Sequence, residues 1–532
     1  MNVGVTLGPV EAGAVAAAER LDRLPARIHH LVERWARERP DDLALIDYDG
    51  RRLTWAEFQA ATESAARHMA QAGVRGGDRV IVVLENSAAA AAVLMACSRL
   101  DAWAVLVNAR LASPEIARIR DHCEPRALVF TDGPSPEAAR HADEAGAASV
   151  EDPLFGSFRL VGPLPCSPEP VKPDNGEQVA ALIYTSGTTG TPKGVMLTHR
   201  NVLFIATVSG ALRALAAGDR VYAVLPISHV FGLASTFLGT INAGGTLELV
   251  SRFDPAHLAA ALADGVTVFQ GVPAMYAKLL EHLDRQGQPL VAPRLRYMSS
   301  GGAPLDIDWK RRVEARFGIT LANGYGLTEA APTVAQTRID GPRDDDSVGP
   351  ALPTVETRIV GPDGRDVPPG EPGELWARGP NLMKGYYRDA AATGAVITPE
   401  GWLRTGDLAR AEPDGALFIV GRAKELIIRS GFNVYPPEVE AALNVHPHVV
   451  QAAVVGRQVS GNEEVIAFVE PVPGSGIDAA TLLAFAAERL APYKRPQHLF
   501  VVERMPASAT GKVQKHALVA LAAQMIAAGE RP

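Results

Sequence analysis

The stretch Tyr184–Gly194 reads YTSGTTGTPKG and contains three glycines, six hydroxyl or phenol side chains, one proline and one lysine. Glycine lets the backbone approach an anion closely, hydroxyl groups can hydrogen-bond to it, and lysine adds a positive charge. The stretch is not a Walker A loop, because Pro192 stands where a second glycine is required and Gly194 stands where a Ser or Thr would hold Mg²⁺. It therefore predicts a phosphate-binding loop of another kind.

This loop follows a strand in a long α/β pattern. The apolar run VAALIY ends at Tyr184, which disfavours the alternative that the loop is a plain surface turn. Short β-rich runs alternate with helical, alanine-rich stretches over the first four-fifths of the chain, as is typical of layered α/β structure. After about Gly341 the sequence becomes turn-rich and hairpin-like, and after Arg422 it has strands and helices enough for a small domain. We therefore predict an α/β fold with a large domain at residues 1–421 and a small α+β domain at residues 422–532.

Composition narrows the function. The chain has 532 residues, of which 47% are hydrophobic and 21% charged, and its formal net charge of −8 gives no support to nucleic acid binding. Its three cysteines form no CxxC pair, so neither a disulfide framework nor a zinc site is indicated. The N-terminus lacks a basic and then apolar leader, and the longest apolar run, 88–97, is far shorter than the roughly 20 residues of a membrane span. We expect a cytoplasmic protein without a transmembrane segment.

Two further stretches could hold a nucleotide. In SSGGAPL, at 299–305, Gly301 and Gly302 follow a strand and leave room for a flat ring against the backbone. In NGYGLTEAAP, at 323–332, an amide is followed by an aromatic ring between glycines and then by a hydroxyl and a carboxylate. Such a set can stack a base and hold a metal, although each stretch alone is a weak signal.

These stretches belong to an ordered set. The chain contains, in this order, YTSGTTGTPKGV, LPISHVFG, SGGAPL, NGYGLTE, WLRTGDLA, GRAKELIIRSGFNVYPPEVE and ATGKVQK. From about Leu31 to its end it resembles the adenylate-forming superfamily, and within it an acyl-CoA synthetase. The resemblance implies a large N-terminal domain with a small barrel-like β subdomain, and a mobile C-terminal domain. It also implies ATP, Mg²⁺ and coenzyme A: a carboxylate and ATP give acyl-AMP and pyrophosphate, and the CoA thiol then displaces AMP.

The resemblance also implies where the nucleotide binds. By matching position, Asn323 would contact the adenine edge, Tyr325 would stack on its face, and Asp407 would accept the ribose hydroxyls with Arg422 assisting. An aspartate in a TGD turn is otherwise usually a turn former. The residues expected to contact ATP or CoA are Thr185, Ser186, Gly187, Thr188, Thr189, Gly190, Lys193, Gly301, Gly302, Ala303, Asn323, Gly324, Tyr325, Gly326, Asp407, Arg422, Lys424 and Gly431.

Four residues are expected to carry the chemistry. Lys512 of ATGKVQK would serve adenylation, because a lysine that reaches both the carboxylate and the α-phosphate offsets charge where two anions meet. Glu329 matches the Mg²⁺ ligand and Thr328 the α-phosphate contact, and His229 matches a gate between the acyl pocket and the CoA channel. The alternatives are a surface lysine, a solvated glutamate at a helix start and a packed core histidine. Lys515 is a poorer candidate, either solvated or touching CoA phosphates.

The second half-reaction is expected to need a turn of the small domain. The resemblance places the hinge at Lys424, two residues after the arginine of GRAKE, where many relatives have aspartate. Gly431 would let the pantetheine arm pass close to the backbone, although a tight turn before the helix at Pro436 is an alternative reason for this glycine.

The acid itself is less well defined by the sequence. The stretches expected around it, 229–232, 301–302 and 326–331, are largely small or apolar, and Glu329 is their only carboxylate. This favours a fatty acid of medium or long chain, or an aryl acid, over an amino acid. The alternatives are transfer to a carrier-protein thiol in trans, a luciferase-like oxidative adenylator and a non-catalytic nucleotide-binding regulator, of which the full catalytic set disfavours the last. A homodimer is compatible with the sequence.

Overall fold

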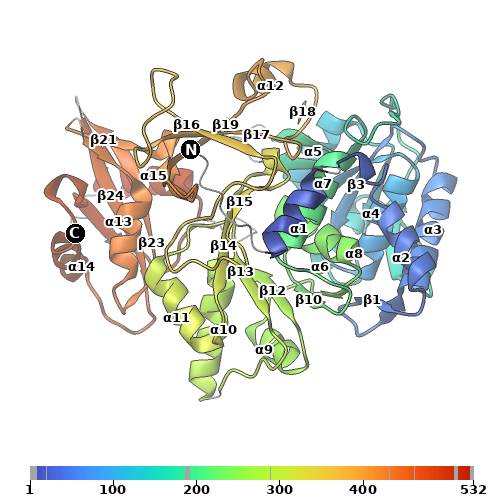
Figure 1. Ribbon diagram of the computed structural model, residues 1–532, viewed down its shortest axis with the longest axis horizontal. Coiled ribbons are helices and arrows are strands. Elements are labelled where there is room, and N and C mark those ends of the chain that lie inside the picture. Colours follow the sequence, from blue (N-terminus) through green and yellow to red (C-terminus); the bar gives the residue numbers. More distant parts are fainter. Residues whose placement is uncertain are drawn as a thin grey trace. The chain divides into compact units, whose positions relative to one another are not determined.

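The computed structural model describes residues 9–19, 21–185, 192–287, 289–430, 432–459, 462–507 and 513–527 (Figure 1). The described part of the chain forms two compact units. Unit 1 comprises Met1–Gly302, Arg311–Thr357 and Ala377–Leu403. Unit 2 comprises Ala303–Lys310, Arg358–Trp376 and Arg404–Pro532.

Unit 1 contains two mixed eight-stranded sheets. The first has the order β15 (Thr333–Gln336), β14 (Leu321–Gly326), β13 (Tyr297–Ser300), β12 (Val268–Gly271), β10 (Arg220–Ala223), β11 (Thr246–Leu249), β1 (Leu43–Ile46) and β2 (Arg52–Thr54). The second has the order β18 (Gly385–Tyr386), β9 (Lys193–Thr198), β8 (Val179–Thr185), β4 (Trp103–Asn108), β3 (Arg79–Leu84), β5 (Ala127–Phe130), β7 (Gly156–Val161) and β6 (Ala148–Asp152). This layering confirms the predicted α/β class.

Central strands of unit 1, such as β3 and β5, are mostly apolar runs because they are covered on both faces. All six residues of β3 are buried, and β3 pairs in parallel with β4 and β5. The alanine-rich α4 (Ala88–Arg99) packs against β3, β4 and α3 (Trp55–Gln71), and small side chains allow that close approach. Ser87 caps α4 by accepting the Ala90 N–H at 3.2 Å, which satisfies a backbone donor at the helix start.

Further helices complete unit 1 (Figure 1). They are α1 (Pro9–Ala18), α2 (His30–Glu38), α5 (Ser113–Cys123), α6 (Pro136–Glu144), α7 (His199–Leu212), the π-helix η2 (Phe231–Leu238), α8 (Gly239–Ala243), α9 (Pro255–Ala263), α10 (Pro273–Gln286) and α12 (Ala390–Val396), with 3₁₀ turns η1 (Leu21–Arg23) and η3 (Thr328–Ala330). Helix α11 (Ile307–Phe317) spans the division between the units. Within unit 1, α7, α8 and η2 pack together, and η2 also packs on β10.

Unit 2 is built from three small sheets. The four-stranded sheet, most of which belongs to unit 2, has the order β16 (Glu356–Val360), β17 (Gly373–Arg378), β19 (Leu403–Ala411) and β20 (Leu417–Arg422). The others pair β21 (Ile427–Arg429) with β22 (Phe432–Val434), and β23 (Val449–Val459) with β24 (Asn462–Pro471) and β25 (His498–Val501). The helices are η4 (Ala423–Glu425), α13 (Pro436–Asn444), α14 (Ala479–Ala487), η5 (Pro492–Lys494) and α15 (Lys515–Ala527). The domain boundary at residue 421 and the hinge stay predictions.

Candidate active site

The glycine- and threonine-rich stretch joins two antiparallel strands of unit 1. Thr185 ends β8, Lys193 begins β9, and these two residues are register partners. A Cβ on Gly194 would lie 2.4 Å from the Leu182 Cδ2 atom, so any other residue would displace that side chain. The hairpin therefore holds the two ends of the loop together. The remaining predicted loop contacts, Ser186, Gly187, Thr188, Thr189 and Gly190, lie outside the described residues.

Tyr386 links the loop lysine to the predicted metal ligand. Its hydroxyl donates to Glu329 Oε1 at 2.7 Å, and the Lys193 ammonium lies 4.9 Å from the centre of its ring. The Met383 N–H donates to the Glu329 carbonyl at 2.9 Å, which fixes η3 beside β18. Burial, and then the Glu329 carboxylate, raise the pKa of Tyr386, so the phenol remains a donor. Sequence reasoning missed Tyr386, because its GYY stretch carries no phosphate or metal signal.

The surroundings of Glu329 fit a magnesium ion. The side chain is half-buried, and Tyr386 takes only one of its two carboxylate oxygens. No described residue donates a hydrogen bond to the second oxygen, Oε2, which leaves a hard anionic ligand of the type that Mg²⁺ prefers. Thr328, predicted to contact the α-phosphate, is also half-buried and begins the same 3₁₀ turn.

A Tyr386→Phe variant is expected to need about ten times more Mg²⁺ than wild type, because loss of a group that orients a metal ligand weakens metal binding by about that factor. The measurement is the Mg²⁺ concentration at which ATP half-maximally raises the melting temperature, together with the Mg²⁺ dependence of pyrophosphate exchange. Tyr387→Phe is the matched control, because the Tyr387 hydroxyl donates to Glu169 at 2.8 Å. Equal shifts in the two variants would contradict the assignment.

Asn323 and Tyr325 lie on β14, in a hairpin with β15. Asn323 is buried, and its Nδ2 donates to the carbonyls of Asp346 and Ser347 at 3.2 and 3.1 Å. Its Oδ1 accepts the Gly324 N–H at 3.0 Å. The Asn323 amide therefore holds the 346–347 segment against β14, and its contact with adenine stays a prediction.

The turn after β14 requires a close backbone approach. A Cβ on Gly326 would lie 2.2 Å from the Pro332 carbonyl oxygen, so glycine is needed there. The Leu327 N–H donates to that same oxygen at 3.0 Å. This fold-back positions η3, and with it Glu329.

Gly301 and Gly302 follow β13, as predicted. A Cβ on Gly301 would lie 3.0 Å from the Phe231 Cε1 atom, so an aromatic ring lies directly beside that backbone. Gly302 has a φ of +78°, which favours glycine. His229 is exposed, and its Nδ1 accepts the Phe231 N–H at 3.3 Å, so it is not the packed core histidine of the alternative interpretation. Its role as a gate stays a prediction, as does the contact of Ala303 with adenine.

Asp407 and Arg422 are paired in unit 2. They are register partners on β19 and β20, and Arg422 Nε lies 3.2 Å from Asp407 Oδ1. The Thr405 hydroxyl accepts the Asp407 N–H at 3.1 Å and donates to the Leu375 carbonyl at 2.6 Å, which fixes the TGD turn. The two residues assigned to one ribose thus lie side by side, and their binding of that sugar stays a prediction.

The hinge candidate Lys424 is exposed in η4. Lys515, at the start of α15, is not solvated: its Nζ lies 2.9 Å from Glu425 Oε2 and 2.8 Å from Glu440 Oε1. Burial lowers the pKa of Lys515, but the two carboxylates outweigh it, and the pKa is raised above the ordinary lysine value. The predicted Lys512 and Gly431 lie outside the described residues.

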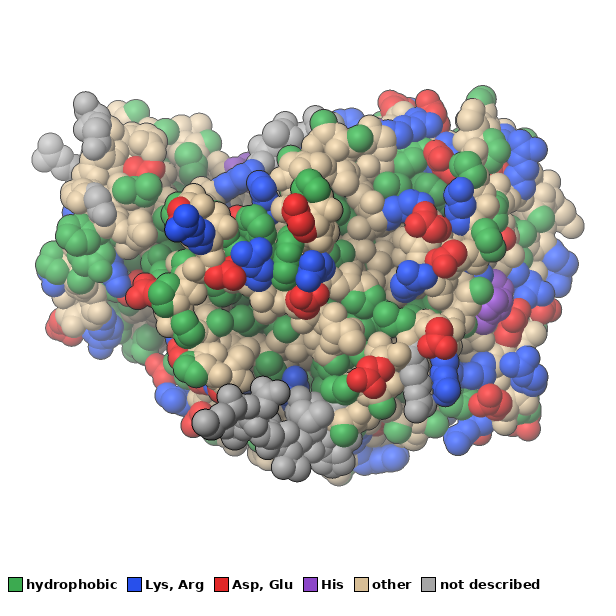
Figure 2. Space-filling model, turned by 45° about the horizontal axis from the view of Figure 1, so that its top comes forward, with side chains coloured by type: hydrophobic (Ala, Val, Ile, Leu, Met, Phe, Trp, Pro, Cys, Tyr) green, Lys and Arg blue, Asp and Glu red, His purple; other side chains and the backbone are tan. Residues whose placement is uncertain are grey.

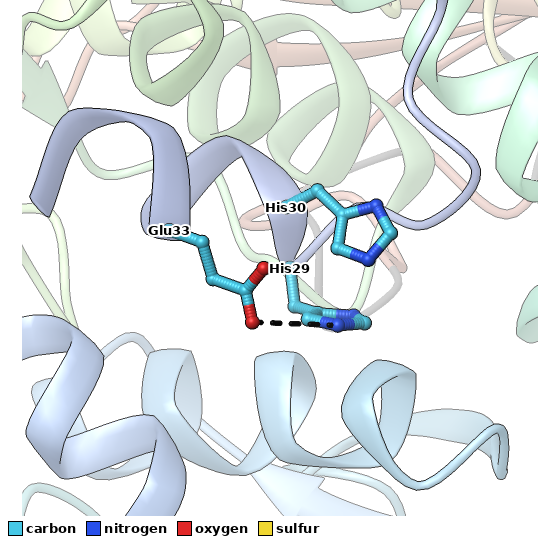
Figure 3. Close-up of side chains that lie close together, drawn as sticks. All are labelled: His29, His30 and Glu33. Atoms are coloured by element: carbon cyan, nitrogen blue, oxygen red, sulfur yellow. Dashed lines mark ion pairs between the residues drawn. The ribbon is translucent and has the colours of Figure 1, made fainter. Parts of the chain in front are cut away.

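A cluster in unit 1 resembles a second metal site. His29, His30 and Glu33 bring potential ligand atoms within 4.8 Å of one another (Figure 3). However, His29 Nδ1 lies 2.9 Å from Ser98 Oγ, and Arg99 Nη1 lies 2.6 Å from Glu33 Oε1. Burial, and then nearby cationic side chains, lower the pKa of His29 to about 3. A metal ion would meet an arginine already paired with Glu33, so we interpret the cluster as a packing contact.

Basic and acidic side chains are interspersed on the face shown in Figure 2. Many surface charges are paired, such as Arg388 with Glu124 and Arg378 with Glu356, both at 2.7 Å. In the part of the chain that the structure describes, no helix combines the length and the apolar character needed to cross a bilayer.

Comparison with known proteins agrees with the motifs. The AMP-binding enzyme family matches residues 32–387, and the AMP-binding enzyme C-terminal domain matches residues 438–512. The chain is 36% identical to the feruloyl-CoA synthase of Amycolatopsis sp, covering 88% of this chain and 94% of that protein. It is 35% identical to the sulfoacetate–CoA ligase of Cupriavidus necator, covering 93% and 97%. The o-succinylbenzoate CoA synthetase of Bacillus subtilis, in complex with ATP and a magnesium ion, matches with a TM-score of 0.78 at 29% identity, covering 92% and 98%.

The feruloyl-CoA synthase match covers most of the chain, and the first family match, at 32–387, contains the motifs from YTSGTTGTPKGV to NGYGLTE. The ATP and magnesium of the Bacillus structure, and the CoA named for each relative, agree with the predicted reactants. The chain belongs to the adenylate-forming, AMP-binding enzyme family of acyl-CoA synthetases, and it is an AMP-forming acid–CoA ligase that uses ATP, Mg²⁺ and coenzyme A.

Proposed function

We propose that this ligase activates an aryl carboxylic acid, in which a short linker joins an aromatic ring to the carboxylate, and not a medium- or long-chain fatty acid. Two of the compared proteins are named for aryl acids, feruloyl and o-succinylbenzoate. The third is named for sulfoacetate, so the names alone do not decide the acid class. The choice rests on the buried polar side chains of Ser299 and Gln270, near Gly301.

The surroundings of the Gly301 backbone change from apolar to polar over a short distance. The Phe231 ring lies against Gly301, whereas Ser299 and Gln270, on β13 and β12, are buried and polar. Gly301 and Ser299 are two residues apart, which is about 7 Å along a strand. An alkyl chain that continued past this point would leave the polar groups without hydrogen bonds, at a cost in free energy. A single aromatic ring is short enough to end there.

The residues of the candidate site have distinct roles in this proposal. A Mg²⁺ ion at Glu329 would neutralise charge on the phosphate oxygens, and Tyr386 orients the carboxylate that holds it. Lys193 shelters the departing pyrophosphate, and Lys512 offsets charge where the carboxylate meets the α-phosphorus. Asp407 binds the ribose. The small domain then turns about Lys424 and presents a different face for thioester formation.

ATP–pyrophosphate exchange with a panel of acids tests the acid class. Arylpropenoic and arylacetic acids are expected to exceed octanoate, palmitate and sulfoacetate by roughly tenfold or more in kcat/KM. The highest kcat/KM for octanoate or palmitate would refute the proposal. Supplying either CoA or a carrier-protein thiol as acceptor then measures which thiol receives the acyl group.

Two expectations about the setting of the protein also stay proposals. A cytoplasmic location would be tested by fractionating cells that express the chain, and a homodimer by light scattering of the purified protein. Neither affects the assignment of the acid.

A further inference from the structure

Several polar side chains near Gly301 are buried without hydrogen-bond partners among the described residues. Gln270 is 0% exposed, and neither its Nε2 nor its Oε1 has a hydrogen-bond partner among the described residues. The same holds for the hydroxyl oxygens of Ser299 and Ser235. Native proteins rarely bury such groups unpaired, because each one has given up its hydrogen bonds to water. Several of them near a substrate site point to a missing hydrogen-bonding group.

The three residues belong to one layer of unit 1. Gln270 and Ser299 are register partners on the parallel strands β12 and β13, so their side chains leave the sheet on the same face. Tyr297 lies two residues before Ser299 and shares that face, and its side chain interacts electrostatically with Arg213, just after α7. Arg213 in turn donates from Nη1 to the Ser235 carbonyl at 3.1 Å. The π-helix η2 is thereby tied to this face of the sheet.

A second contact, at Gly301, also links this strand to η2. Gly301, two residues after Ser299, lies beside the ring of Phe231, which begins η2. Ser235 follows Phe231 by about one helical turn. Ser299 therefore lies between Gly301, which is beside η2, and Tyr297, which is linked to η2 through Arg213, and it shares this face of the sheet with Gln270.

The chemistry of this layer suits a neutral group that both donates and accepts. The Gln270 amide offers two donor hydrogens and an acceptor oxygen, and each serine hydroxyl can do either. The nearby Arg213 guanidinium donates to the Ser235 carbonyl and to Gln336 Oε1, and its Nε is buried without a partner among the described residues. A carboxylate can only accept, and it would meet the Gln270 oxygen as well as the donors. A hydroxyl group can satisfy both ends of the amide.

We propose that Gln270, Ser299 and Ser235 are specificity-determining residues that hydrogen-bond a hydroxyl group at the end of the acid remote from its reacting carboxylate. The inference rests on the proposed function and narrows it from aryl to hydroxyaryl acids. An acid without the hydroxyl would leave the buried amide and hydroxyls unpaired in the complex, and this is expected to reduce kcat/KM by roughly 10- to 100-fold.

Paired acids test the proposal directly. The pairs are 4-hydroxycinnamate with cinnamate and 4-hydroxyphenylacetate with phenylacetate, and the measurement is pyrophosphate release in the presence of ATP and CoA. Wild type is expected to prefer the hydroxylated member of at least one pair by roughly 10- to 100-fold. Gln270→Leu and Ser299→Ala should reduce that preference by about tenfold or more, because kcat/KM for the hydroxylated acid falls more than kcat/KM for the unsubstituted acid.

Ser300→Ala is the matched control. Ser300 is the next residue of β13, is buried and also lacks a partner among the described residues, but its side chain lies on the opposite face of the sheet. Its variant should keep the wild-type preference. An equal loss of preference in Ser300→Ala and Ser299→Ala would overturn the assignment.

Thermal unfolding of the acid-free protein gives a second readout. Gln270→Leu removes an unpaired buried amide and is expected to raise the melting temperature, whereas a fall would show that the amide has a structural partner and would count against the proposal. Equal use of both members of each pair by wild type would refute the hydroxyl site and leave the aryl proposal standing. Activity with alkyl acids and none with all four aryl acids would refute both.

Discussion

A Lys512→Ala enzyme is expected to form acyl-AMP roughly 10²- to 10³-fold more slowly than wild type, and to convert synthetic acyl-AMP and CoA to thioester at close to the normal rate. The first effect has the size of a lost electrostatic contact in a transition state. The carboxylate and the α-phosphate are both anionic, so a lysine placed between them acts where their charges meet. The second expectation follows because the proposed turn about Lys424 removes Lys512 before the thiol attacks.

Separate assays of the two half-reactions decide the matter. Pyrophosphate exchange reports adenylate formation, and a single-turnover reaction of synthetic acyl-AMP with CoA reports the thioester step. Equal losses in both assays would mean that Lys512 is structural or that one conformation serves the whole reaction.

Lys424→Pro is the complementary variant for the same test. Proline fixes φ near about −65°, so it restricts the backbone at the proposed hinge. It should impair the thioester step more than adenylate formation, because only the second step follows the turn. Opposite patterns in Lys512→Ala and Lys424→Pro would thus separate the chemical role of one lysine from the mechanical role of the other.

Local chemistry in the sequence was enough to predict much of the fold and the family. The apolar run VAALIY predicts β8, and the glycines and hydroxyls after it predict a phosphate loop, since both signals lie within a few residues of chain. The same holds for Gly301 and Gly302 after β13. The order of seven such motifs then identified the family that the comparisons confirm.

Contacts between distant segments could not be predicted in this way. Tyr386 is 57 positions from Glu329 in the chain, and its role depends on β18 pairing with β9 at the edge of a sheet. Gln270 and Ser299 read as ordinary residues of two buried strands, and only their parallel register brings them together. Period and composition describe one segment at a time, so they do not contain this information.

For Lys515, the interpretation as a solvated side chain was wrong, and the contact with CoA phosphates stays a prediction. As a lysine near a GK turn it was expected to be solvated or to contact CoA phosphates, but it is bonded to two carboxylates of unit 2. Glu425 comes from η4, beside the proposed hinge, and Glu440 from α13. The side chain therefore links the start of α15 to the hinge segment. We expect this link to contribute measurably to the free energy of unfolding.

A Lys515→Met variant is expected to lower the free energy of unfolding by about 2 to 3 kcal/mol. The Lys515 side chain is 23% exposed, and those of Glu425 and Glu440 are 33% and 14% exposed. Removing the lysine leaves two partly buried carboxylates without their cation, which costs more than the loss of an exposed ion pair. Methionine retains most of the apolar stem, so packing changes little.

Urea unfolding of wild type and variant measures this difference. Lys494→Met is the matched control, because Lys494 also pairs with a glutamate of α13, Glu438, which is 43% exposed and is its single carboxylate partner among the described residues. Lys494→Met should lower the free energy of unfolding by less than about 1 kcal/mol. Equal losses in the two variants would mean that the second carboxylate adds nothing.

The pH dependence of the stability difference between wild type and Lys515→Met tests whether the two ion pairs are its source. Because the folded-state pKa of Lys515 is raised, its contribution is fully present below the ordinary lysine pKa of about 10.4 and is lost as the pH rises through the higher folded value. The stability gap between wild type and Lys515→Met should therefore stay constant between about pH 7 and pH 9, and shrink above about pH 10.5. A gap that already shrinks between pH 7 and pH 9 would require another titrating group, and the two ion pairs would then not be the source of the stability.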